Sequence, residues 1–187
     1  MRQPGDRAPA PEPLALVQDL INTNDIEGRH DRLTEPAGLR GFCADHGLPD
    51  PGATAEDLAE VRRFRELLRE VCAAHTGADL PVAERSALAE LTARAPLVLA
   101  VGPDGTVRAA PAASSGTAAL LGRICAEVLA AEAAGTWRRL KACAAHGCRW
   151  VYYDHSPAGR GRWCTMSMCG SRAKMRSYRA GRAGGAR

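Results

Sequence analysis

Four cysteines in the C-terminal quarter of the chain stand at a spacing suited to metal binding. Cys143 and Cys148 form one pair, Cys164 and Cys169 form a second, and fifteen residues separate the pairs. Zinc prefers a tetrahedron of soft or borderline ligands, and a short loop between two cysteines lets both sulfurs face one ion. Four thiolates close the coordination shell and leave no position for water. The spacing therefore predicts one structural Zn²⁺ and no catalytic metal.

Two histidines offer an alternative ligand set. His146 lies inside the first cysteine pair, and His155 lies between the pairs. Either could replace a cysteine, although a solvated loop histidine is the simpler interpretation. A disulfide framework is disfavoured because the chain has 7 cysteines, an odd number. The remaining three, Cys43, Cys72 and Cys125, fall on apolar helix faces and are predicted to be small core residues.

The N-terminal residues indicate a reducing compartment. The opening stretch MRQPGDRAPAPEP is rich in proline and charge and has no apolar signal segment. No stretch approaches the length of about 20 apolar residues that a membrane span needs. We therefore expect a cytoplasmic protein without membrane contact, where paired cysteines bind metal more often than they form disulfides.

Charge is distributed unevenly along the chain. Residues 1–136 carry 13 Arg and 20 acidic residues, so 13 − 20 = −7, whereas residues 137–187 carry 12 basic residues and one acid, so 12 − 1 = +11. A solvated face is one interpretation of such a basic segment. An excess this large in a short segment favours an electrostatic partner, and nucleic acid is the commonest one.

The basic residues nearest the second cysteine pair are the candidate DNA contacts. A helix is predicted directly after Cys169, and a helical repeat would place Arg172, Arg176 and Arg179 on one face with Lys174 off it. Arg160 and Arg162 precede the second pair and are predicted to flank the same groove of double-stranded DNA.

Aromatic side chains are concentrated in the same segment. Trp150, Tyr152, Tyr153 and Trp163 could each stack on bases or fill a small core. We favour a core position for Trp150 and Trp163, because so small a unit needs large apolar side chains.

The remaining pattern predicts an α+β fold with two domains. A mostly helical domain with a small antiparallel β-hairpin is expected at 13–136, and a small treble-clef-like zinc finger at 137–180. Residues 1–12 are predicted to be a disordered leader and 181–187 a disordered basic tail. In the first domain we expect helices at 13–23, 39–47, 54–75, 79–95 and 115–134 and a hairpin at 97–110. In the finger we expect strands at 149–154 and 160–164, joined by a turn.

The cysteine segment resembles the CGNR zinc finger family of bacteria. The matching residues include Cys169-Gly170-Ser171-Arg172, where Ser171 replaces the family asparagine, and the stretch from Arg162 to Met166. Cys148-x-Trp150, Asp154-x-Ser156 and Ala173-Lys174 are also similar. In that family an N-terminal domain called ABATE precedes the finger, and the stretch from Leu14 to Asn22-Thr23 is similar to the opening of that domain. The resemblance implies a stress-linked transcription regulator.

These features bear on three classes of function. The leading prediction is a zinc-containing, DNA-binding transcription regulator whose N-terminal domain senses a small-molecule effector, forms a homodimer or contacts a partner. The alternative is an interaction module whose finger docks on an acidic protein surface, or on RNA. An enzyme is disfavoured, because the chain has no Gly-rich phosphate loop, no His-Glu-x-x-His and no Gly-x-Ser-x-Gly motif.

Overall fold

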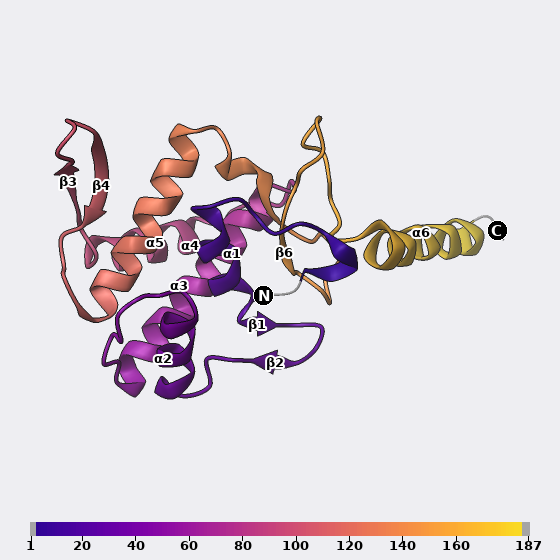
Figure 1. Ribbon diagram of the computed structural model, residues 1–187. Coiled ribbons are helices and arrows are strands. Elements are labelled where there is room, and N and C mark those ends of the chain that lie inside the picture. The colour runs from indigo at the N-terminus through magenta and orange to yellow at the C-terminus, as the bar shows by residue number, and fades with distance from the viewer. Residues whose placement is uncertain (1–2, 185–187) are drawn as a thin grey trace.

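The computed structural model describes residues 3–184, without the side chains of Asp6 and of residues 181–184. A helical body is followed by a finger from which the last helix projects (Figure 1). The helices are α1 Leu14–Asn22, α2 Pro36–Asp45, α3 Ala55–Ala74, α4 Val82–Ala93, α5 Gly116–Ala133 and α6 Ser171–Gly184. Shorter turns are the 3₁₀ helices η1 Pro4–Asp6 and η2 Trp137–Arg139 and the π-helical turn η3 Met166–Gly170.

The strands form small antiparallel pairs. Strand β1 Asn24–Asp25 pairs with β2 His30–Asp31, β3 Leu97–Val101 pairs with β4 Val107–Pro111, and β5 Leu140–Ala142 pairs with β6 Val151–Tyr153. The α+β class is therefore confirmed, and so is the hairpin expected at 97–110. No helix among residues 3–184 is long and apolar enough to cross a membrane.

Helix α3 is the central element of the body. It begins with a capping box, in which the Thr54 hydroxyl accepts from the Asp57 N–H and the Asp57 carboxylate accepts from the Thr54 N–H. Its apolar stripe includes Leu58, Val61 and Phe64, all buried. The helix expected at 54–75 is confirmed, because capping chemistry and periodicity agree at the sequence level.

The finger shares the hydrophobic core of the body. Leu140 and Ala142 of β5 and Val151 and Tyr153 of β6 lie in the same buried cluster as the apolar faces of α1, α3 and α5. The core therefore runs across the boundary at 136–137 that the sequence indicated, and the base of the finger is built into the helical body.

Asn22 at the end of α1 joins the body to β6. Its side-chain amide donates to the Val151 carbonyl at 2.7 Å, and its carbonyl oxygen accepts from the Val151 N–H at 2.9 Å. The buried amide thus pairs with one residue of β6 as a neighbouring strand would. The Asn22-Thr23 pair that marked the resemblance therefore has a structural role, which sequence reasoning did not assign.

The prediction of a disordered leader at 1–12 is wrong for residues 3–12, which are ordered against the finger. Gln3 is buried, and its side-chain oxygen accepts from the Trp150 indole N–H at 3.0 Å and from the Gln18 amide at 3.1 Å. Ala10 is also buried. Composition alone suggested disorder, but these long-range contacts compensate the entropy of ordering the segment. Residues 1 and 2 lie outside the described part.

The prediction of a disordered tail at 181–187 is wrong for its first residues. Helix α6 continues to Gly184, so residues 181–184 are helical. Residues 185–187 lie outside the part of the chain that the structure describes.

Candidate metal centre and basic helix

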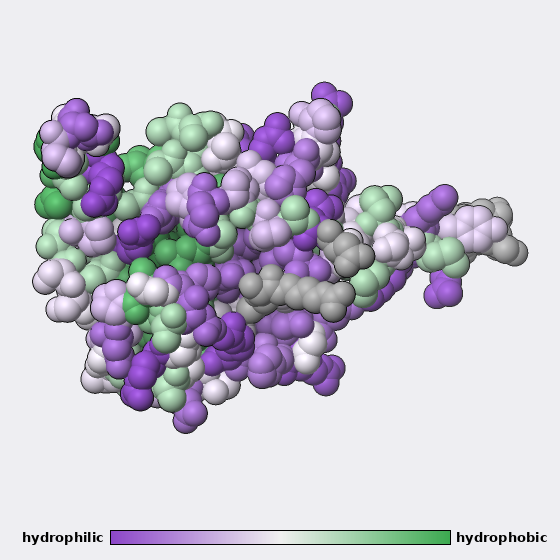
Figure 2. Space-filling model, viewed as in Figure 1, coloured by the Kyte–Doolittle hydropathy of each residue, from purple (hydrophilic) through white to green (hydrophobic). Residues whose placement is uncertain are grey.

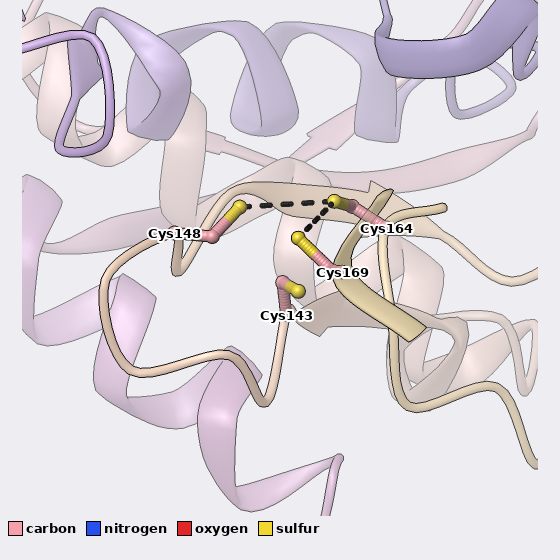
Figure 3. A group of neighbouring side chains, drawn as sticks. All are labelled: Cys143, Cys148, Cys164 and Cys169. Carbon is pink, nitrogen blue, oxygen red and sulfur yellow. Dashed lines mark hydrogen bonds between the residues drawn. The ribbon is translucent and has the colours of Figure 1, made fainter. Parts of the chain in front are cut away.

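The four cysteines predicted as ligands converge on one point (Figure 3). Their sulfur atoms all lie within 4.8 Å of one another. The Cys164 Sγ is 3.7 Å from the Cys148 Sγ and 3.6 Å from the Cys169 Sγ. A Zn–S bond of about 2.3 Å gives a tetrahedral edge of about 3.8 Å, whereas a disulfide bond is about 2.05 Å long. These separations fit the corners of a zinc tetrahedron, so the cluster is a structural zinc site.

The first cysteine pair sits on a tight turn between β5 and β6. The Cys143 N–H donates to the Trp150 carbonyl at 2.9 Å, and the Cys148 N–H donates to the Ala145 carbonyl at 2.9 Å. Arg149 closes the turn with a φ of 53°. This backbone turns both sulfurs toward the same side, as the short spacing predicted.

The second pair sits where a loop enters the last helix. Cys164 ends the loop and Cys169 lies in η3, directly before α6. The Ala144 N–H donates to the Arg162 carbonyl at 2.9 Å and joins the two cysteine segments. A zinc ion held by these cysteines would therefore anchor the N-terminal end of α6.

The strand pairing predicted for the finger is wrong. Residues 151–153 do form a strand, but it pairs with 140–142, before the first cysteine, and residues 160–164 are not a strand. The reason lies in Asp154, whose carboxylate accepts from the N–H groups of Ser156 and Gly161 at 3.1 and 2.7 Å. These bonds fold 154–161 into a compact loop and leave β6 free to pair with β5.

A buried ion pair between Lys141 and Asp154 stabilises the loop at 154–161. The Lys141 Nζ is 3.0 Å from the Asp154 Oδ2 and also donates to the carbonyls of Gly159 and Gly161. Burial by itself raises the pKa of Asp154, but the hydrogen bonds from Ser156, Lys141 and Gly161 lower it below its usual range on balance. Lys141 was not singled out from the sequence, where it is only one of the twelve basic residues after 136.

The histidines are not part of the sulfur cluster. Among the described residues, the cluster that could hold a metal here consists of the four cysteines. His146 is exposed on the first turn, and the His155 ring lies 3.1 Å from the Pro9 carbonyl. Trp150 is buried against the cysteines and Trp163 packs partly buried beside them, as expected for core positions of the finger. Tyr152 is buried in the same cluster.

The ionisation of the four thiols is interdependent. Hydrogen bonds from Cys148 and Cys164 lower the pKa of the Cys143 thiol. The hydrogen bond to Cys143 raises the pKa of Cys164, and burial followed by the charge of Cys143 raises the pKa of Cys169. One thiolate therefore opposes ionisation of its neighbours, and a bound divalent cation would offset this repulsion.

The other three cysteines belong to the helical core, as predicted. Cys43 and Cys72 are buried and Cys125 packs partly buried against the same cluster. Burial raises the pKa of Cys43 and of Cys125 to about 11. These thiols are therefore protonated near neutral pH and are poor nucleophiles.

Arg7 of the leader joins β6 to the segment that carries Cys164. Its guanidinium donates to the carbonyls of Cys164 at 2.8 Å and of Tyr153 at 3.1 Å, and it lies 4.7 Å from the centre of the Tyr152 ring. No local pattern could reveal this role, because 157 residues separate Arg7 from Cys164.

Replacing Arg7 by alanine is expected to weaken zinc binding, because the carbonyl of Cys164 loses its donor. Loss of a contact behind a metal ligand costs about 10- to 100-fold in affinity. Competition for zinc with a chromogenic chelator measures the change. Arg85→Ala, which alters an exposed arginine on α4, is the control. Equal zinc affinity in both variants would refute the clamp.

The six basic residues singled out as DNA contacts are all exposed, and the structure divides them into two groups. One group lies on α6, which projects from the body (Figure 1). The other lies in the loop before Cys164 and not on a strand. The six are Arg160, Arg162, Arg172, Lys174, Arg176 and Arg179.

Arg172 differs from the other basic residues of α6. It forms an ion pair with Glu27, in the loop between β1 and β2. This contact orients the start of α6 relative to the body. Met175 and Tyr178 are exposed beside the basic face.

The fold and the site define a zinc-finger protein in which a helical body carries a four-cysteine finger. Residues 14–140 match the model of the ABATE family, described as "Putative stress-induced transcription regulator", and residues 139–182 match the CGNR zinc finger. The chain belongs to the ABATE family, and its finger is a CGNR zinc finger, as the sequence resemblance indicated. A search of curated proteins found no match.

Proposed function

We propose that this chain is a transcription regulator that binds double-stranded DNA through α6. The observation that carries the proposal is a basic helix whose side chains over residues 171–180 are mostly exposed and whose N-terminal end adjoins the zinc site. A rigid helix with arginines on one face is suited to the phosphate backbone and the major groove. The excess of positive charge after residue 136 supports the same partner. The family description supports a regulatory role.

The geometry favours Arg176 and Arg179 as the principal contacts. Both are exposed, and helical spacing places them on one face of α6. Arg172 shares that face but is held by Glu27. In this proposal Arg172 sets the direction of the helix, and Arg160 and Arg162 add contacts from the neighbouring loop.

A salt series with the zinc-loaded protein tests the proposal. Each phosphate contact contributes about 0.9 to the slope of log affinity against log salt on duplex DNA. The double variant Arg176→Ala/Arg179→Ala is therefore expected to make this negative slope shallower by about 1.8 and to weaken binding at every salt concentration.

A control must separate local contacts from net charge. Arg40→Ala/Arg94→Ala removes the same charge from exposed positions on the body. We expect the control to retain the wild-type slope. Equal slopes in the wild type and the α6 variant would overturn the proposal and favour docking on an acidic protein. Tighter binding to RNA of the same sequence would reassign the partner.

A further inference from the structure

Exposed apolar side chains gather at the end of the molecule opposite α6. They belong to the β3–β4 hairpin, which lies at the left in Figure 1, and Figure 2 shows apolar residues at the same place. Leu99 is 77% exposed and Val101 71%, and Val98 and Val107 are also exposed. Such a concentration of apolar surface on one hairpin marks an interaction site.

The backbone of β3 has a free edge. The Gly102 N–H donates to the Thr106 carbonyl, and the Ala112 N–H donates to the Pro96 carbonyl, so the even-numbered residues of β3 exchange hydrogen bonds with β4. The N–H and C=O groups of Leu97, Leu99 and Val101 therefore point away from β4. No hydrogen bond to these groups occurs among the described residues.

This edge lacks the features that normally block strand pairing. Natural edge strands carry charged side chains, proline or bulges that prevent addition of another strand. No residue between Arg94 and Asp104 is charged, and no proline lies within β3. The edge therefore presents exposed backbone groups that have no protein partner among the described residues, flanked by apolar side chains, and another extended strand can pair with them.

We propose that β3 pairs with β3 of a second copy of this chain, in antiparallel orientation about a two-fold axis at Leu99. Leu99 then faces its own counterpart, and Leu97 faces Val101 of the other copy. Each of these pairs exchanges two backbone hydrogen bonds. The two hairpins become one four-stranded sheet.

The packing of the hairpin on α5 extends this interface. Pro111 of β4 lies against Gly122 of α5, where a Cβ at Gly122 would lie 3.0 Å from the Pro111 Cβ. The face carrying Pro111 also carries Leu99 and Val101, because cross-strand partners share a face. The two-fold axis puts the equivalent face of the second hairpin on the same side of the four-stranded sheet. The α5 helices of both copies would therefore lie on that side. Exposed Leu129 of α5 would lie beside this apolar face.

A second copy fits this edge better than an unrelated strand. The edge is self-complementary, because apolar residues meet apolar residues in every pair about the axis. The whole chain carries a net charge of +4, yet an uncharged strand brings no like charges together at the contact. Pairing at this end also leaves both α6 helices exposed (Figure 1). This inference rests on the β3 edge alone, so it holds whether or not α6 binds DNA.

Sedimentation equilibrium of the zinc-loaded protein at micromolar concentration tests the pairing. We expect a dimer for the wild type. Leu99→Lys places like charges opposite each other at the axis and should raise the dimer dissociation constant by at least about tenfold. Leu99 is largely exposed, so this variant keeps its fold. Val82→Lys, which adds the same charge at an exposed valine on α4, should remain as dimeric as the wild type.

Amide hydrogen exchange identifies the surface that pairs. The amides of Leu97, Leu99 and Val101 should be protected in the wild type and exchange rapidly in Leu99→Lys. A monomeric wild type would overturn the proposal. So would a Leu99→Lys dimer as tight as the wild type, or a dimer in which these amides exchange freely.

Discussion

Replacing Cys164 by serine is expected to abolish zinc binding and to unfold the outer part of the finger. Structural zinc contributes about 10–16 kcal/mol in zinc-finger peptides, and the buried residues around the cysteines are few. Removal of zinc with a chelator should have the same effect. Amide signals of 143–149 and 154–180 should collapse to disordered positions in the NMR spectrum.

The core position of β5 and β6 limits this unfolding. Leu140 and Val151 lie in the core of the body, and Asn22 holds Val151 by two hydrogen bonds. The signals of 140–142 and 151–153, and of the body helices, should therefore persist. Cys125→Ser, which alters a thiol away from the site, is the control and should bind one zinc ion. Unchanged finger signals in Cys164→Ser would contradict the prediction.

Replacing Arg69 by methionine is expected to lower the free energy of unfolding by about 3–5 kcal/mol. Arg69 is buried, and its guanidinium donates to the carbonyls of Ile21 at 2.7 Å, of Asn24 at 2.9 Å and of Arg149 at 2.9 Å. It also forms an ion pair with Glu66. Methionine keeps much of the apolar volume but leaves these carbonyls without a donor.

Urea unfolding followed by circular dichroism measures this effect. Arg63→Met is the matched control, because Arg63 is exposed on the same helix. A surface substitution of this kind changes the free energy of unfolding by less than about 0.5 kcal/mol. A change below about 1 kcal/mol in Arg69→Met would show that other donors or water replace the guanidinium.

The helical body illustrates what local pattern predicts. The capping box at Thr54 and Asp57, the apolar stripe of α3 and the turn between β3 and β4 are all encoded within a few residues. The same holds within each pair of zinc ligands, because a loop of four residues between two cysteines lets both sulfurs face one ion. The CGNR and ABATE resemblance rested on motifs of the same local kind and is confirmed.

The strand error in the finger has a physical cause. Apolar and aromatic residues at 151–153 predict a strand correctly, but not its partner. Two candidate segments, 140–142 and 160–164, flank it at similar distance along the chain. The choice depended on Asp154, whose hydrogen bonds close a loop on the far side of β6.

The sequence by itself determined the class of fold, the four-cysteine zinc site and the uneven distribution of charge. Only the tertiary structure decided that the leader clamps the finger through Arg7, that Arg69 ties the body to the first cysteine turn, that Asn22 ties it to β6, and that Glu27 holds Arg172. The physical reason is the separation along the chain between the interacting residues. Helix caps, turns and metal-ligand pairs act over a few residues, whereas buried donors find carbonyls far along the chain only after the core has formed.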